Sequence, residues 1–298
     1  MMTQEALTRP WLGNYFFGTI RLCKAQISLF AALSAVAGLC VVAPPSAATL
    51  ASVAIGVWLV GCGAGALNQY QERDIDALMP RTAGRPLPSG CVRPRFALAV
   101  SFILIGSGTA VLCLAGRLAP AGLGLAAVFW YNGFYTGFKT RSALAAIPGA
   151  AVGAIPPAVG WTAGGGHLLD FRLAALCFFF FMWQVLHFFI HCLAFAKEYE
   201  KAELPSLSGL FTESQLKRLA FQWLLAVAAS AFLVGFSGLI HSWLAFTVIA
   251  AASFWFIFQG IAFITNRRNV YARLFRETNY YLLIIVTVLS LDGYFYLS

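Results

Sequence analysis

The sequence predicts an all-α fold: a polytopic membrane bundle of nine transmembrane helices around a central cavity. Hydrophobic residues make up 60% of the chain and charged residues only 10%, whereas a soluble domain has about 25% charged residues. The mean hydropathy is +0.78. Nine apolar stretches approach the ~20 residues that a helix needs to cross a bilayer. No polar stretch is long enough for a soluble domain, so we expect a single integral-membrane domain over residues 1–298.

Each predicted helix is bounded by Gly, Pro or a short polar stretch. The first ends before a Pro pair, the second before the charged stretch that begins at Asn68, and the third begins at Pro94. The fifth ends at a Gly-rich loop, and the sixth ends where Lys and Glu residues return. The expected spans are 22–43, 48–67, 94–115, 119–137, 143–162, 171–195, 217–238, 241–264 and 278–297.

The distribution of basic residues predicts the topology of these nine helices. With the N-terminus placed in the cytoplasm, every Lys and Arg except Arg117 and Arg172 falls on the inner side. Cytoplasmic loops of membrane proteins carry such an excess of Lys and Arg. We therefore expect a cytoplasmic N-terminus, an external C-terminus and a bacterial inner-membrane location. Topology explains much of the net charge of +9, so we expect no nucleic-acid partner.

A cluster of acids follows the second predicted helix, in the stretch LNQYQERDIDALMPRTAGRPLPSG. Asn68, Glu72 and Asp76 are spaced i, i+4 and i+8, so on a helix they share one face. Their oxygens are the ligands that Mg²⁺ prefers, with water and substrate phosphate in the remaining positions. Asp74 points elsewhere unless the helix ends or bends. The competing interpretation is a solvated charged loop, but a carboxylate at membrane depth costs ~2.5–3.5 kcal/mol and usually lines a cavity or binds a ligand.

A second acidic cluster, AKEYEKAELPSL, follows the sixth predicted helix and contains Glu198. Two such clusters facing each other can hold Mg²⁺ and a diphosphate, and an apolar bundle can shelter an isoprenoid chain and a carbocation from water. No GxxxxGK[ST] loop is present, which favours prenyl transfer over nucleotide chemistry. Arg suits bidentate phosphate contacts and Lys supplies a point charge. The candidate diphosphate-binding cations are Arg73, Arg81, Arg85, Lys139, Arg141 and Lys197.

Four stretches resemble the intramembrane prenyltransferases of the UbiA type, and most closely the protohaem farnesyltransferases, or haem O synthases. ERDIDA…RTAGRPL is similar to their first aspartate-rich motif. YTGFKTRSALAAIPGAAVGAIPPAVGW, WQVLHFFIHCLAFAKEYEKAELPSL and ARLFRETNYYLLIIVTVLSLD resemble later segments. The resemblance covers most of the chain, although Glu72 stands where Asp is commoner in the family.

This resemblance implies a reaction and a set of site residues. The family transfers the farnesyl group of farnesyl diphosphate to a vinyl group of haem b, with Mg²⁺ as cofactor. Here it would place Asn68, Glu72, Asp76 and Glu198 at the metal, with Asp74 near them. The basic residues above would assist the diphosphate. The residues matched on the acceptor side are Gln184, His187 and Tyr199.

Two other functions are compatible with the same residues. A related enzyme can prenylate another acceptor, such as an aromatic ring or a quinone precursor. A secondary transporter can use similar charges as a substrate gate, but transporters place binding residues near the bilayer midplane, whereas these acids lie at helix ends. His187 and His191 are spaced i, i+4 and can bind haem iron; for His191, which the family does not share, we favour simple packing.

Overall fold

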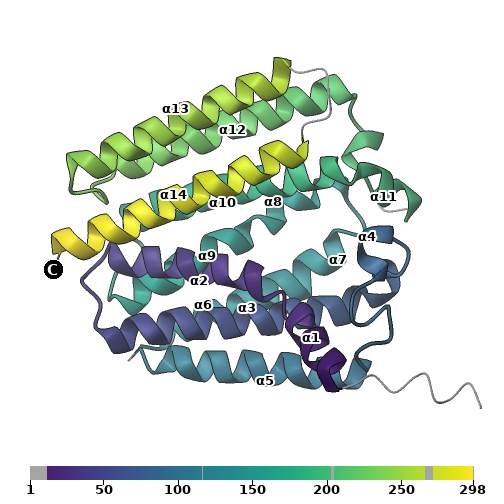
Figure 1. The fold of residues 1–298 in the computed structure, drawn as a ribbon. Helices are drawn as coiled ribbons and strands as arrows, with labels where there is room; N and C mark the ends of the chain where they lie inside the picture. Colours follow the sequence, from purple (N-terminus) through teal and green to yellow (C-terminus); the bar gives the residue numbers. More distant parts are fainter. Residues whose placement is uncertain (1–11, 116, 203–204, 266–270, 298) are drawn as a thin grey trace, which may run out of the picture.

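A computed structural model of the chain describes residues 12–115, 117–202, 205–265 and 271–297, and these form a bundle of helices (Figure 1). No strand occurs in those ranges, so the all-α prediction is confirmed. The principal helices are α1 (Leu12–Leu22), α2 (Ala25–Cys40), α3 (Ala47–Asp76), α5 (Pro94–Cys113), α6 (Leu118–Val128), α9 (Ala151–Ala163), α10 (Phe171–Ala194), α12 (Glu213–Phe236), α13 (Trp243–Thr265) and α14 (Tyr271–Leu297).

Shorter helical pieces connect these elements or extend them. A π-helix, η2, and the short α7 continue α6 along the chain, and η3 and α8 lead into α9. The short helix α4 follows α3, which contains the first acidic cluster, and the short helix α11 follows α10 and contains the second. The bounds of the short elements are α4 (Pro80–Ala83), η2 (Phe129–Tyr135), α7 (Thr136–Phe138), η3 (Ala143–Ala145), α8 (Ala146–Gly149), α11 (Ala196–Lys201) and η4 (Leu207–Gly209).

The described part of the chain contains seven helices that are long and apolar enough to cross a membrane. They correspond to the predicted spans at 48–67, 94–115, 143–162, 171–195, 217–238, 241–264 and 278–297. The other two predicted spans overlap the 16-residue α2 and the run of α6, η2 and α7. The predicted count of nine is therefore not confirmed by length and composition, because one of these two helices is short and the other is interrupted.

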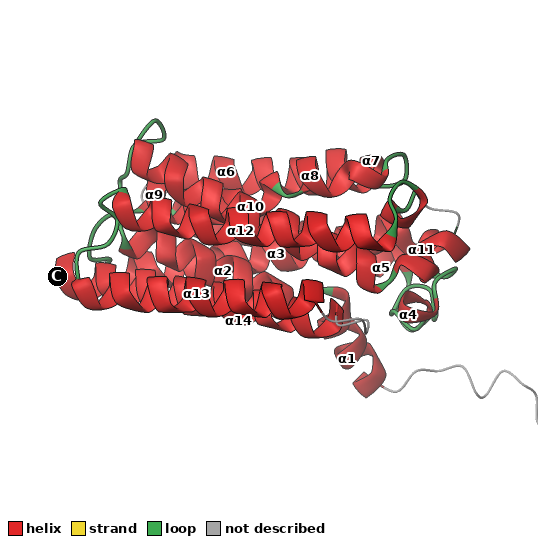
Figure 2. Ribbon diagram, turned by 90° about the horizontal axis from the view of Figure 1, so that it is seen from above, coloured by secondary structure: helices red, strands yellow, loops and turns green. Residues whose placement is uncertain are grey.

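The long helices run side by side (Figures 1 and 2). α1, α4 and α11 lie at one end of the bundle, and the C-terminus lies at the opposite end (Figure 1). α3 packs on α2 and α5, α10 packs on α12, and α14 contacts α2, α10 and α13. The site described below lies at the end where α3 gives way to α4 and α10 gives way to α11.

Helices α2 and α9 approach each other so closely that only glycine fits between them. A side-chain carbon on Gly160 would collide with the backbone oxygen of Ala35, and one on Gly38 would collide with that of Pro157. Small residues at such crossings let helix backbones pack against each other where no water drives association. This contact joins the second half of the chain to α2, and therefore to the neighbouring α3.

Gly160→Ala is expected to destabilise the bundle by about 1–3 kcal/mol, the usual cost of overpacking. Gly106→Ala is the matched control, since Gly106 has open space around it in the middle of α5. The thermal unfolding midpoints of the purified variants in detergent check this prediction. A midpoint for Gly160→Ala as high as that of Gly106→Ala would contradict the α2–α9 packing.

Candidate active site

One face of α3 presents the predicted trio of polar side chains to the interior of the bundle. Asn68, Glu72 and Asp76 are only 2%, 4% and 1% exposed. Asp74 lies on another side of the helix, with its side chain 84% exposed. α3 continues as a regular helix through Asp76, so the i, i+4, i+8 spacing places all three residues on one face. The sequence spacing therefore distinguished the three buried polar residues from the solvent-exposed Asp74.

Each member of the trio has a basic partner from a different part of the chain. The Lys24 Nζ donates to Asn68 Oδ1 at 2.7 Å. The Lys139 Nζ lies 2.8 Å from Glu72 Oε1 in an ion pair. Arg85 Nη1 donates to both Asp76 carboxylate oxygens, at 2.7 and 2.6 Å. Buried carboxylates need such compensation, and the result is three cations converging on one acidic helix face.

Lys24 occupies an unusual backbone position between α1 and α2. Its φ of 48° and ψ of 42° lie in the left-handed region, which costs a residue other than glycine roughly 1–2 kcal/mol. Backbone strain of this kind concentrates at functional sites, and here it directs a cation at Asn68.

The π-helix η2 and the short α7 that follows it bring three further polar residues toward α3. Asn132 is buried and its Nδ2 donates to the Ala64 backbone oxygen at 3.0 Å, one turn before Asn68. Asn68 Nδ2 in turn donates to Thr136 Oγ1 at 3.2 Å. Tyr131 lies close enough to Glu72 to sense its charge. π-helical turns are rare in proteins but occur frequently at functional sites, and this one, together with α7, places three polar side chains near the acidic face.

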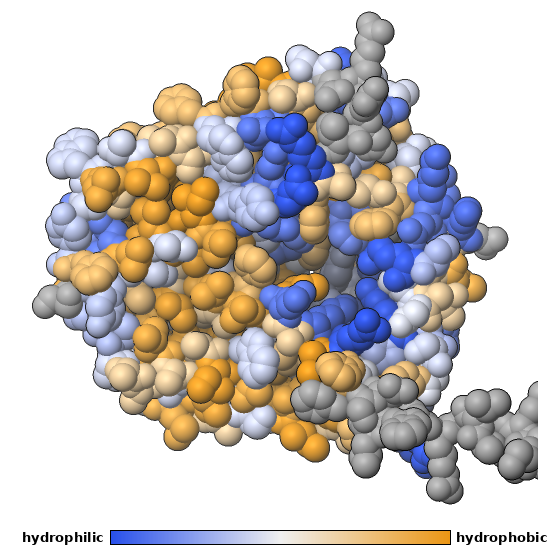
Figure 3. Space-filling view, viewed as in Figure 1, coloured by the Kyte–Doolittle hydropathy of each residue, from blue (hydrophilic) through white to orange (hydrophobic). Residues whose placement is uncertain are grey.

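The second acidic cluster reaches the first through the connection after α3. Glu198, in the first turn of α11, accepts a hydrogen bond from the Arg81 backbone N–H at 3.2 Å. The Arg81 guanidinium lies 4.6 Å from the centre of the Phe195 ring. The structure therefore joins the two predicted clusters, but the described contact is between Glu198 and the α4 backbone. Hydrophilic residues gather at this end, around a hollow in the surface (Figure 3).

Three of the predicted diphosphate-binding cations lie away from the acidic face. Arg73 donates to the Tyr70 backbone oxygen at 2.8 Å and pairs with the exposed Asp74. Arg141 and Lys197 are exposed. Of the six predicted cations, Lys139 and Arg85 contact the trio and Arg81 contacts the second cluster. The positions of the other three give their predicted roles no support.

Two of the three predicted acceptor residues, Gln184 and His187, lie on α10, and Tyr199 belongs to α11. The Gln184 side chain packs over Gly153, where a larger residue would displace it. The His187 ring lies 4.5 Å from that of Phe275 on α14, and its Nδ1 is buried with no hydrogen-bond partner among the described residues. His191, one turn later, also faces Phe275 and lies within electrostatic range of Arg81. The side chain of Tyr199 lies outside the described residues.

The side-chain oxygens on the acidic face of α3 suit a magnesium ion that also binds a phosphate group of the substrate. Within the described ranges, no three His, Cys, Asp or Glu side chains are close enough to hold a metal by themselves. Mg²⁺ usually takes one or two protein carboxylates and completes its shell with water and substrate phosphates. Asn68, Glu72 and Asp76 supply that kind of partial oxygen shell, with Lys139 2.8 Å from Glu72 Oε1 as a nearby cation for the phosphate. These residues therefore fit a shared metal–diphosphate site.

Sequence reasoning did not identify Lys24, Tyr131, Asn132 or Thr136 as site residues. Asn132 and Thr136 lie in a predicted span, so a polar side chain inside an apolar run was the available signal. Lys24 lies at the cytoplasmic start of the first predicted span, where a basic residue is equally explained by topology. Its contact with Asn68 crosses 44 positions of sequence and depends on the packing of α2 against α3.

The model of the UbiA prenyltransferase family matches residues 28–285. The chain belongs to this family. Among curated relatives, a protoheme IX farnesyltransferase of Geobacter sulfurreducens is 40% identical over 222 residues, or 74% of this chain and 81% of that protein. One of Opitutus terrae is 31% identical over 300 residues, 98% of this chain and 99% of the relative. The chain is thus a UbiA-family prenyltransferase and an integral membrane protein.

Solved UbiA-family structures share the fold. A UbiA homologue of Aeropyrum pernix K1 aligns with a TM-score of 0.70 and 18% identity, over 90% of this chain and 96% of that one. A homologue of Archaeoglobus fulgidus, bound to GPP and Mg²⁺, aligns with a TM-score of 0.65 and 13% identity, over 92% and 99%. These UbiA-family neighbours confirm the predicted bundle.

Proposed function

We propose that this UbiA-family enzyme transfers the farnesyl group of farnesyl diphosphate to a vinyl group of haem b in a magnesium-dependent reaction. The principal support is the convergence of Lys24, Lys139 and Arg85 on the buried acids of α3. That arrangement combines oxygen ligands for a metal with cations for a diphosphate. Relatives named protoheme IX farnesyltransferase, at 31% and 40% identity, support the choice of farnesyl donor and haem acceptor.

The chemistry begins with loss of the diphosphate. As the bond between farnesyl C1 and oxygen breaks, its electron pair leaves with the diphosphate, and Lys24, Lys139 and Arg85 neutralise the charge that develops there. Mg²⁺, when held by Asn68, Glu72 and Asp76, supplies further charge neutralisation of the leaving group. Glu198 fixes the α4 connection through Arg81, and we assign it to the same metal–diphosphate site.

The acceptor completes the reaction on the apolar side of the site. The terminal vinyl carbon forms the new bond to farnesyl C1, and the positive charge moves to the adjacent carbon next to the macrocycle. Water adds there and loses a proton, which gives a hydroxyethylfarnesyl side chain. We assign His187, Gln184 and Tyr199 to acceptor binding; the rings of Phe275 and Trp183 beside His187 offer an apolar surface for the macrocycle.

The location of the site follows from the same proposal. α4 and α11 lie at the bundle end that contains most of the basic connections, which suits the cytoplasmic face of a bacterial inner membrane. A water-soluble diphosphate can leave from that face, while the farnesyl chain and haem enter from the bilayer.

The purified protein is expected to convert haem b, and not 4-hydroxybenzoate, when supplied with farnesyl diphosphate and Mg²⁺. Mass spectrometry of both acceptors after parallel incubations checks this prediction, and a reaction with EDTA in place of Mg²⁺ is the control. Prenylated benzoate with unchanged haem would overturn the haem assignment while leaving prenyl transfer in place.

A further inference from the structure

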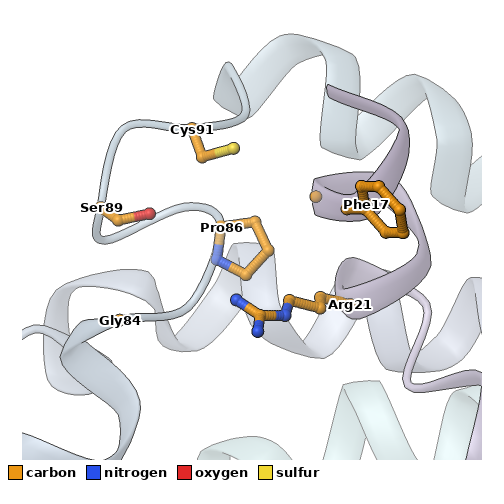
Figure 4. Close-up of a pocket in the computed structure, with 7 residues that line it drawn as sticks. Phe17, Arg21, Gly84, Pro86, Ser89 and Cys91 are labelled. Carbon is orange, nitrogen blue, oxygen red and sulfur yellow. The ribbon is translucent and has the colours of Figure 1, made fainter. Parts of the chain in front are cut away.

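A small pocket lies between helix α1 and the connection that follows α4, apart from the acidic face of α3 (Figure 4). Its volume is about 240 Å³, and Arg21, Pro86 and Ser89 are among the residues that line it. Pockets for drug-sized ligands span roughly 300–1,000 Å³. The pocket is thus too small for a haem or a farnesyl chain, and suits a compact polar group.

Arg21 gives this pocket its charge. The guanidinium extends from the end of α1 toward Pro86 and Gly84, and the Ser89 hydroxyl lies across the opening from it (Figure 4). The side chain is exposed, and no ion pair to it is formed by the described residues. A guanidinium matches the geometry of a phosphate group with two parallel hydrogen bonds. The chemistry of the lining therefore selects a phosphate-bearing anion.

The surroundings of the pocket indicate that this anion comes from a lipid. Phe17 and Ile20, on the same helix as Arg21, are 66% and 45% exposed. Arg93 and Arg95 are exposed just beyond the pocket residue Cys91. Apolar side chains beside basic ones are typical of helices that lie in the membrane interface and attract anionic headgroups.

The end of α1 that would hold the headgroup is also fastened to the active-site helix. Gln69 Nε2 donates to the backbone oxygens of Arg21 and Leu22, both at 2.9 Å. In the sequence, Gln69 directly follows Asn68, which belongs to the acidic face. On the other wall of the pocket, Gly84 directly precedes Arg85, the partner of Asp76. A ligand in the pocket would thus contact both segments that support the prenyl-transfer site.

We propose that this pocket binds the phosphate group of an anionic phospholipid, with Arg21 as its principal ligand. The proposal does not rest on prenyl transfer, because binding is measured directly. Native mass spectrometry of the full-length protein, purified with an equimolar mixture of phosphatidylglycerol and phosphatidylcholine, gives the ratio of the two retained lipids. Arg21→Gln is expected to lower the preference for phosphatidylglycerol about fivefold, as the ~1 kcal/mol that one basic residue contributes near an anionic surface implies.

Arg95→Gln is the matched control, because it removes the same charge at the same end of the bundle but outside the pocket. It is expected to change the ratio less than twofold. Ser89→Phe, which fills the pocket and keeps Arg21, is expected to lower the ratio as Arg21→Gln does. An unchanged ratio in both pocket variants, or an equal loss in Arg95→Gln, would overturn the proposal in favour of diffuse surface charge.

A competition arm identifies the source of the phosphate group. Millimolar inorganic phosphate is added to the wild-type protein that retains phosphatidylglycerol. Retention of the lipid supports a headgroup that is anchored by its acyl chains. If phosphate displaces the lipid from the wild-type protein but not from Arg21→Gln, the same site binds a phosphate group that comes from solution. If phosphate displaces the lipid equally from both proteins, the result counts against the site.

Discussion

Asp76→Asn is expected to slow farnesyl transfer about 100-fold or more, a loss of about 2.7 kcal/mol of transition-state stabilisation. Asp76 is 1% exposed, supplies a carboxylate to the metal–diphosphate face and holds Arg85 through both of its oxygens. The substitution keeps the shape of the side chain but removes the charge. It thus weakens the proposed metal site and releases the arginine from its position in the same step.

The rate of diphosphate release from farnesyl diphosphate, measured over a range of Mg²⁺ concentrations, checks this prediction. Asp74→Asn is the matched control, since Asp74 lies two residues away on the exposed side of α3, and it should retain nearly the wild-type rate. Glu72→Gln provides a second test if Asp76→Asn does not fold, with folding judged by gel filtration and thermal unfolding. Rates within threefold of wild type in a folded Asp76→Asn protein would remove Asp76 from the site.

Lys139→Met is expected to reduce both stability and activity. Lys139 is the cation paired with Glu72, whose side chain is only 5% exposed. Removing one partner of a buried ion pair costs about 3–5 kcal/mol, because the remaining charge has no compensation. The diphosphate also loses one of its three proposed cations, so the transfer rate should fall about 100-fold. Lys139→Arg retains the charge and should preserve most of the stability.

A double variant separates the two effects of Lys139. Glu72→Gln combined with Lys139→Met removes both charges and should recover most of the lost thermal stability, while activity stays low. Arg141→Met is the matched control, because Arg141 follows Lys139 by two positions and is exposed. Thermal midpoints and initial rates of the four proteins measure these outcomes. Recovery of activity in the double variant would remove both Lys139 and Glu72 from the proposed metal–diphosphate site.

The sequence predicted the acidic face because that face depends on local geometry. Asn68, Glu72 and Asp76 repeat every four residues, and α3 keeps its regular period through all three. The same period separated Asp74 from the set. Hydropathy located every long helix of the bundle for a comparable reason: the bilayer requires a minimum apolar length, which the sequence displays directly.

The partners of that face could not be predicted, because they depend on how the chain folds back. Arg73 and Arg85 looked equivalent in the sequence, but the connection after α3 returns Arg85 to Asp76 and leaves Arg73 outside. Lys24 reaches Asn68 from a left-handed turn between two helices. The α6 region contains a π-helix whose packing on α3 is tertiary. Periodicity carries no information about any of these contacts.

The proposed transfer of a farnesyl group to haem b can be measured in cells. Mass spectrometry compares the haems extracted from a haem O-deficient host with and without the expressed protein. We expect a new haem whose mass exceeds that of haem b by one hydroxyethylfarnesyl modification, and we expect this haem to be missing with Asp76→Asn. Unchanged haem b in cells that contain the folded wild-type protein, together with another prenylated product, would rule out haem b as the acceptor.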